Sequence, residues 1–298
     1  MTALDADADG QQECSIRTPQ MSVLVDPAEG GSLTEWSLFQ PPINLLDTLT
    51  RRPEPYHHKL RAKGNPVQAG APAGGGPASI HDLIGVKEEG LASRLVYDDH
   101  RRTAFLDYGL AAMPTLHEVA HGTWAERRLW SGGVFRQAPR GRTAGRTRAG
   151  APPHQQVWCG GASVDVWMVR QAPGGLIRKT VQVGLRSPTV RCTLALDGVE
   201  APVVGVEFTL SLRDPDCLAE ARAHQQLTQW ALKEPEAGLA LRLSIDPPAT
   251  LMQVPIETVS ESEEGLERTY QGLGVVCFWT VAATRAWTAR MDWAVQRL

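Results

Sequence analysis

The segment Val206-Glu-Phe208-Thr-Leu210-Ser-Leu212-Arg213 alternates strictly between apolar and polar residues. A period of two places its four apolar side chains on one face of an extended strand and its four polar ones on the other. Alternation of this kind is typical of antiparallel sheet with one buried and one solvated face. The segment therefore predicts a β-strand that covers a hydrophobic core with one face only.

Further stretches repeat this pattern, and turn signals separate them. The stretches are Val190–Leu194, Leu239–Ile245 and Trp287–Val295, and the turn signals are Gly174-Gly175, Asp197-Gly198, Asp214-Pro215 and Pro247-Pro248. Many such strands in one chain favour an all-β fold, an antiparallel β-sandwich. We expect a single domain over residues 1–298 with one or two short helices. The helix candidates are residues 79–84, with Ser79 as the N-cap, and a short helix within 216–234, with Asp216 as the N-cap.

Two stretches have the composition of loops or insertions. Residues 62–77 are rich in Gly and Pro, and residues 136–153 contain five arginines among small residues. The arginine run fits a patch for a polyanion or a solvated loop. No aromatic residue stands between the arginines, so a stacking platform for bases is missing.

Composition excludes several classes of protein. The chain has 298 residues, 42% hydrophobic and 21% charged, with a formal net charge of −3, which is typical of a globular protein and not of a dedicated nucleic-acid binder. No apolar run reaches the roughly 18 residues of a membrane helix, and the N-terminus has no hydrophobic signal core. We therefore expect a cytoplasmic protein without a membrane partner. The five scattered cysteines predict buried, reduced thiols.

Asp5, Asp7, Asp9, Gly10 and Glu13 match the first half of a calcium-binding loop, D-x-D-x-D-G. The twelfth position of such a loop carries a bidentate Glu, and here it is Ile16. The segment therefore fits either an incomplete calcium site or an acidic turn before the first strand. No other cofactor is indicated.

Several segments, in their order along the chain, resemble a known family. They are Asp5–Glu13, Val25–Trp36, Asn44–His57, Ser79–His81, Lys87–Leu91, Leu95–Arg101 and Pro255–Gly272. Together they resemble the C-terminal β-sandwich region of the 4-alpha-glucanotransferases and alpha-amylases of glycoside hydrolase family 57. The resemblance extends from about residue 5 to the C-terminus.

The resemblance implies a supersandwich of the galactose-mutarotase-like kind, with a concave face suited to sugar. It also implies retaining chemistry on alpha-1,4-glucan, which needs two carboxyl groups about 5–5.5 Å apart. In the family both groups belong to an N-terminal (β/α) barrel. No βα alternation precedes Asp5, so we expect the barrel to be absent from this chain and assign no catalytic residue.

Eight residues are candidates for contact with carbohydrate or with a catalytic barrel. They are Trp36, Arg51, Arg52, Glu54, Tyr56, His57, His81 and Glu257. An exposed Trp can stack on a sugar ring, and we expect Trp36, near a loop, to be freer than Trp287 and Trp293. A guanidinium can pair with a carboxylate of a partner, although Glu54 could instead hold an arginine locally.

Three interpretations follow. The chain is a carbohydrate-associated domain that supports a glucan-cleaving barrel in cis or in trans, with alpha-glucan or another carbohydrate as ligand. Alternatively, it is an autonomous aldose epimerase in which His57, His81 and Glu257 exchange protons with a sugar. The third interpretation is a structural sandwich without a ligand.

Overall fold

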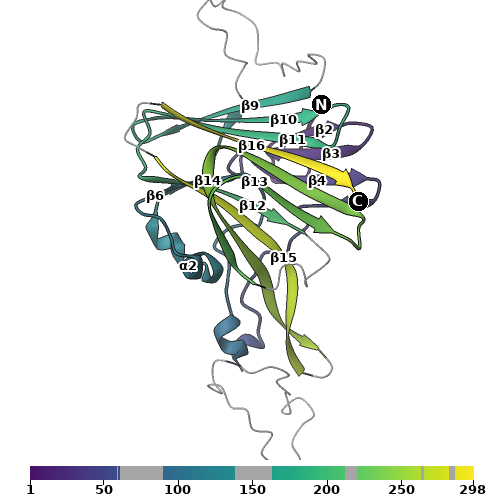
Figure 1. Ribbon diagram of the computed structural model, residues 1–298, viewed down its shortest axis with the longest axis vertical. Coiled ribbons are helices and arrows are strands. Elements are labelled where there is room, and N and C mark those ends of the chain that lie inside the picture. Colours follow the sequence, from purple (N-terminus) through teal and green to yellow (C-terminus); the bar gives the residue numbers. More distant parts are fainter. Residues whose placement is uncertain (59, 61–89, 138–162, 212–219, 263–264, 282–285) are drawn as a thin grey trace, which may run out of the picture.

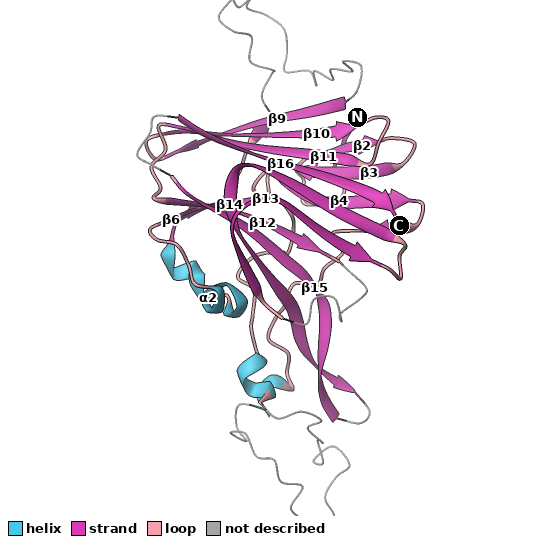
Figure 2. Cartoon of the chain, in the orientation of Figure 1, coloured by secondary structure: helices cyan, strands magenta, loops and turns pink. Residues whose placement is uncertain are grey.

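The protein is an all-β sandwich of a small and a large antiparallel sheet (Figures 1 and 2). The computed structural model describes residues 1–58, 60, 90–137, 163–211, 220–262, 265–281 and 286–298. The small sheet has the order β1-β2-β3-β4-β5. Its strands are β1 (Thr2–Leu4), β2 (Glu13–Arg17), β3 (Met21–Asp26), β4 (Ser32–Phe39) and β5 (Pro42–Asn44).

The large sheet contains eleven strands in the order β7-β6-β12-β15-β14-β16-β11-β10-β9-β8, with β13 paired to β14. These strands are β6 (Leu106–Leu110), β7 (Arg128–Ser131), β8 (Arg136–Gln137), β9 (Ser163–Ala172), β10 (Gly175–Gly184), β11 (Thr189–Asp197), β12 (Val203–Leu210), β13 (Arg222–Glu234), β14 (Leu239–Ser262), β15 (Gly265–Thr280) and β16 (Ala286–Arg297). The expected all-β class and antiparallel pairing are confirmed.

The helices that the structure describes in full are short, as the sequence predicts, and they lie outside the two candidate ranges. They are η2 (Leu91–Arg94), α2 (Leu116–His121) and η3 (Thr123–Arg127). Thr115 and Glu118 form a reciprocal capping box at the start of α2, and Gly122, with φ of 71°, ends it. None of the described helices has the length and apolar content needed to cross a bilayer.

The helix expected within residues 216–234 does not form over residues 222–234, which belong to β13, and residues 216–219 lie outside the described residues. This strand forms a hairpin with β14, and the pairing turns the side chains of Trp230 and Glu234 toward the protein interior. The other helix candidate, residues 79–84, and the proposed loop at 62–77 lie outside the described residues. The stretch 136–153 is described at Arg136 and Gln137 only, which form β8.

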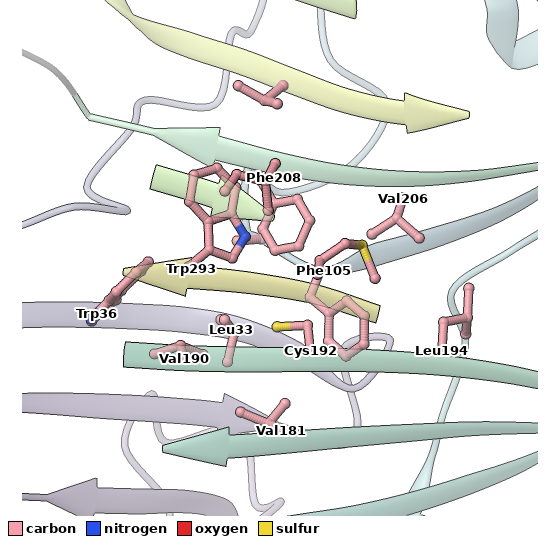
Figure 3. Packing of buried hydrophobic residues seen from close by; sticks show 14 of the residues in the cluster. Leu33, Trp36, Phe105, Val181, Val190, Cys192, Leu194, Val206, Phe208 and Trp293 are labelled. Atoms are coloured by element: carbon pink, nitrogen blue, oxygen red, sulfur yellow. The ribbon is translucent and has the colours of Figure 1, made fainter. Parts of the chain in front are cut away.

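An aromatic cluster joins the two sheets (Figure 3). Trp293 of β16 lies 6.5 Å from Trp36 of β4, 5.1 Å from Phe208 of β12 and 6.2 Å from Trp230 of β13, measured between ring centroids. Trp36 is 2% exposed, so the expectation of an accessible Trp36 is wrong. Alternation in β4 turns its indole inward, where Nε1 contacts the Met21 sulfur at 3.2 Å.

Strand β12 is buried on both faces, which corrects the expectation of a solvated face. Val206 and Phe208 point into the core between the sheets. On the opposite face a second apolar cluster, which includes Tyr108, Val119 and Trp124, brings α2 and η3 against the sheet. The polar residues of β12 on this face are therefore covered, and Glu207 is only 3% exposed.

Buried charges connect strands that are far apart in the order of the large sheet. Lys179 of β10 and Arg170 of β9 both reach Asp107 of β6, at 2.7 and 2.8 Å. The Lys179 ammonium also donates to the Gly30 carbonyl at 2.6 Å and to the Phe105 carbonyl. Since β6 lies near one end of the strand order and β9 and β10 near the other, these contacts show that the large sheet curls on itself.

Replacing Asp107 by Asn should destabilise the fold strongly. The variant leaves the cations of Lys179 and Arg170 without their anion in the interior, which costs about 3–5 kcal/mol when one partner of a buried pair is removed. Urea unfolding followed by circular dichroism measures this loss. The matched control is Asp197→Asn, since Asp197 is 53% exposed in its pair with Arg178 and should cost less than about 1 kcal/mol. If the two variants lost the same free energy of unfolding, the contacts of Asp107 would not be what holds the curled sheet together.

Candidate functional site

Arg51 lies in an internal ion pair. Its side chain is 7% exposed, and its Nη2 lies 2.7 Å from Asp98 Oδ1. Asp98 also accepts from the Arg51 backbone N–H at 2.8 Å and from Arg102 Nη2 at 2.5 Å. Burial alone would raise the pKa of Asp98, but the hydrogen bonds and charges of the two arginines hold it well below its usual range. Arg51 therefore attaches its own segment of the chain to residues 98–102, and it is not accessible to a partner. Its neighbour Arg52 is exposed.

His57 is buried, and both of its ring nitrogens are occupied. Its Nε2 lies 3.0 Å from the Val259 carbonyl, and its Nδ1 lies 3.0 Å from both the Glu54 N–H and the Tyr97 hydroxyl. Because the Glu54 N–H can only donate, Nδ1 is the acceptor and Nε2 carries the proton. Tyr56 donates to the same Val259 carbonyl at 3.3 Å. His57 and Tyr56 thus attach this segment to the β14–β15 ribbon.

The structure brings His57 to the strand that carries Glu257, and these are two of the three residues expected to exchange protons with a sugar. The Glu257 carboxylate lies 3.2 Å from Arg268 and 3.8 Å from Arg94. His81 lies outside the described residues. With the His57 ring bonded to backbone groups and Tyr97, it has no free nitrogen for proton transfer to a sugar.

A different polar cluster forms where the second apolar layer covers β12. The Tyr108 hydroxyl donates to Glu207 Oε2 at 2.7 Å, and Arg102 Nη1 donates to Glu207 Oε1 at 2.8 Å. His100 Nε2 lies 3.4 Å from Glu207 Oε2 and 3.2 Å from the Tyr108 hydroxyl. The other ring nitrogen, His100 Nδ1, lies 2.6 Å from Asp99 Oδ1. We call His100, Arg102, Tyr108 and Glu207 the His100 cluster.

The charges of the His100 cluster stabilise one another. Burial alone would lower the pKa of His100, but the hydrogen bond and charge of Glu207, with help from Asp99, raise it. Burial would raise the pKa of Glu207, but hydrogen bonding to His100 and the charge of Arg102 lower it to about 2. Unfolding returns Glu207 to its ordinary range, so its ionised form stabilises the fold at neutral pH, and this contribution is lost as the pH falls toward 2.

His100 is the member of this cluster that connects it to a cleft at the protein surface. Its side chain is 26% exposed, and it lines a hollow of about 250 Å³ together with Tyr108, Arg101, Glu29 and the loop 131–133. A smaller hollow of about 100 Å³ lies on the side of Trp124 and is also lined by His100.

Arg128 forms part of the wall of both hollows. Its guanidinium lies 4.8 Å from the ring centroids of Tyr108 and Trp124, and its Nη1 donates to Asp99 Oδ2 at 2.7 Å. The stacking and the ion pair hold the Arg128 donors at the cleft surface. The cleft therefore offers fixed donors and acceptors of both charges to a polar ligand.

Sequence reasoning missed the His100 cluster. His100 is within the segment Leu95–Arg101 that carries the family resemblance, but nothing in the segment marks it as facing a cleft. Glu207 occupies a polar position of an alternating strand, where a solvent-facing carboxylate is the ordinary expectation. The sequence does contain one indication of this cover: the capping-box pattern Thr115-x-x-Glu118 predicts the start of the helix that helps to cover Glu207.

Comparison with known proteins identifies the same family over most of the chain. The family model described as alpha-amylase/4-alpha-glucanotransferase, C-terminal, matches residues 5–151 and 205–292. Alpha-amylase 1 of Dictyoglomus thermophilum is 27% identical, covering 93% of this chain and 39% of its own length. The 4-alpha-glucanotransferase of Thermococcus kodakarensis is 25% identical, covering 93% of this chain and 38% of its own length. The chain thus spans about two fifths of the curated relatives it matches.

A solved structure supports the same fold. The crystal structure of 4-alpha-glucanotransferase from Thermococcus litoralis superimposes with a TM-score of 0.69 at 17% sequence identity. The match covers 98% of this chain and 39% of that chain. The sandwich described here therefore resembles part of a longer protein.

Replacing Glu207 by Gln should lower the pKa of His100. The substitution removes the negative charge beside His100 Nε2, while the burial that opposes the protonated imidazole stays. The pKa is measured from the pH dependence of the imidazole NMR signals of His100, with circular dichroism to verify the fold. The control, Glu236→Gln, changes an exposed carboxylate in the β13–β14 turn and should leave the His100 pKa unchanged. A folded Glu207→Gln variant with the wild-type His100 pKa would contradict the pairing.

Proposed function

The chain belongs to the alpha-amylase/4-alpha-glucanotransferase C-terminal domain family, and from this we propose that it is the carbohydrate-associated β-sandwich of an alpha-glucan-acting enzyme of glycoside hydrolase family 57. The observation that carries the proposal is the extent of the match. The matched ranges contain every residue of the cleft, from Glu29 and the His100 cluster to Arg128 and Glu207.

The role we propose is to support a glucan-cleaving barrel, in cis or in trans. The activities in the relatives' names belong to whole proteins of which this chain matches about two fifths. A supporting domain needs a rigid fold and an accessible face rather than its own reactive groups. Leu129 and Val134, 55% and 66% exposed, flank the cleft loop 131–133 and give that face apolar contact area.

We further propose that the cleft contacts alpha-glucan. Sugar hydroxyls both donate and accept hydrogen bonds, and specific sites present fixed polar groups to them within a concave surface. The described cleft offers guanidinium donors on Arg101 and Arg128 and an acceptor in the Glu29 carboxylate. The cation of Arg128, fixed on two aromatic rings, is the group best placed to bind a hydroxyl without a large loss of side-chain entropy.

The geometry does not favour an autonomous epimerase. A carboxylate that acts as a general base needs a pKa near the working pH, and it must be able to reach the substrate proton. Glu207 has a pKa of about 2, is 3% exposed, and its two oxygens already accept from Arg102 and Tyr108. We assign it to positioning His100 and Tyr108 at the cleft.

A cytoplasmic location is also part of the proposal. Its support is the state of two described cysteines, since Cys192 and Cys277 are buried thiols outside any disulfide. Burial raises the pKa of Cys192 and of Cys277, the latter to about 12, so neither forms a reactive thiolate at neutral pH.

The purified chain should bind maltoheptaose, and Arg128→Met should weaken that binding about tenfold or more. Methionine retains apolar contact with Tyr108 and Trp124 but loses the charged donors, whose hydrogen bonds contribute about 1.5–3 kcal/mol each. Isothermal titration calorimetry measures the affinity. The control is Arg297→Met, because Arg297 lines a different cleft of about 350 Å³. Wild-type affinity in the Arg128 variant, or no binding by the wild type, would contradict glucan contact at this cleft.

The chain alone should release no reducing sugar from amylose. Retaining hydrolysis requires a nucleophilic carboxylate and a second carboxylic acid about 5–5.5 Å apart, and we assign neither group to this domain. A reducing-sugar assay on the purified chain, with a heat-inactivated sample as the blank, tests this. Steady release above the blank would mean that the sandwich is an enzyme in its own right.

A further inference from the structure

The connection between β1 and β2 gathers carboxylates at one edge of the small sheet. One carboxylate oxygen from each of Asp5, Asp7 and Glu13 lies within 4.8 Å of the other two. The turn is closed by the Gly10 N–H, which donates to Asp5 Oδ2 at 3.1 Å, and Gly10 has φ of 86°. Asp9 instead accepts from the Gln11 N–H at 2.7 Å and is not part of the gathered group.

The twelfth position of the calcium-loop pattern cannot supply a ligand here. Ile16 lies on β2 with its side chain in the core, 1% exposed. Glu13, four residues after Asp9, is at the start of the same strand and directs its carboxylate back to the turn, where Oε2 accepts from the Ala6 N–H at 2.5 Å. Glu13, at the ninth position of the pattern, therefore adds a third carboxylate to the turn.

The second Glu13 oxygen carries the inference. Glu13 is 2% exposed, and its Oε1 has no hydrogen-bond partner within the part of the chain that the structure describes. A buried carboxylate oxygen without a donor is costly, because water no longer solvates it and no protein group replaces the water. In native proteins such a group usually has a partner, which for a carboxylate is a donor or a cation.

The surrounding charges do not provide that partner. Burial raises the pKa of Glu13, and the charges of Asp26, Asp7 and Asp9 raise it further, against the opposing effect of the Ala6 N–H. Among the described residues the cation that contacts the group is Arg101, whose Nη1 lies 3.4 Å from Asp7 Oδ2 and 3.1 Å from Glu29 Oε2. Arg101 is half exposed and makes no contact with Glu13.

We propose that Asp5, Asp7 and Glu13 bind a calcium ion, with Glu13 replacing the ligand that the twelfth position lacks. The donors are all oxygens, which select a hard cation. Calcium accepts six to eight oxygens in variable geometry, so backbone carbonyls of the turn and water can complete the shell, whereas magnesium demands a nearly regular octahedron. The ion joins β1 to β2 at the start of the chain and has a structural role, separate from the His100 cluster.

Calcium should raise the melting temperature of the purified chain by about 5 °C at a concentration about 100-fold above its dissociation constant. Differential scanning fluorimetry compares EGTA-treated protein with protein in calcium chloride or magnesium chloride. Magnesium should give a clearly smaller shift. If calcium up to about 10 mM leaves the wild-type melting temperature unchanged, the proposal is overturned.

Glu13→Gln should abolish the calcium-dependent shift. In EGTA this variant should melt no lower than the wild type, because the substitution removes the charge of a buried carboxylate. Asp5→Asn changes an exposed side chain, retains the fold and should reduce the shift. The matched control, Asp197→Asn on β11, should keep the full shift. A wild-type calcium response in both Glu13→Gln and Asp5→Asn would place the ion elsewhere and overturn the assignment.

Discussion

The pairing of Asp107 with Lys179 and Arg170 is the constraint on which the shape of the large sheet depends. All three charges lie in the interior, where a charge without a partner is costly, so the strands that carry them must approach one another. These strands stand near opposite ends of the strand order. The same ammonium of Lys179 also binds the carbonyl of Gly30 in the β3–β4 turn, which fixes the small sheet inside the curl.

The curl also creates the candidate site. It leaves β12 with an apolar core on one face and the layer of α2 and η3 on the other. Glu207 is therefore buried, and it stays ionised because Arg102, Tyr108 and His100 surround it. A carboxylate held in this way is a poor proton acceptor but a rigid support. The arrangement positions His100 at the cleft and agrees with a binding or supporting domain better than with a catalytic one.

The N-terminal third, where the resemblance to the family is dense, is stabilised mainly by internal contacts. Arg51 pairs with Asp98, and His57 bonds to the β14–β15 ribbon at Val259. Residues that carry a family resemblance can thus stabilise the fold shared by the family without contacting a ligand. The exposed members of this segment, Arg52 and Glu54, remain predictions as contacts for a partner.

The sequence by itself determined the class of fold, because a period of two needs no tertiary information. Residues 239–245 and 287–295 form strands with the predicted residues inside, except that Trp287 is only half-buried. Only the tertiary structure decided which strands are covered twice, since burial of the second face depends on segments distant in the chain. Along the chain, Glu207 and Lys179 are ordinary polar positions, and Glu13 belongs to an incomplete calcium-loop pattern. Each is buried through contacts made across the fold, and the partners available in space determine whether its charge is balanced.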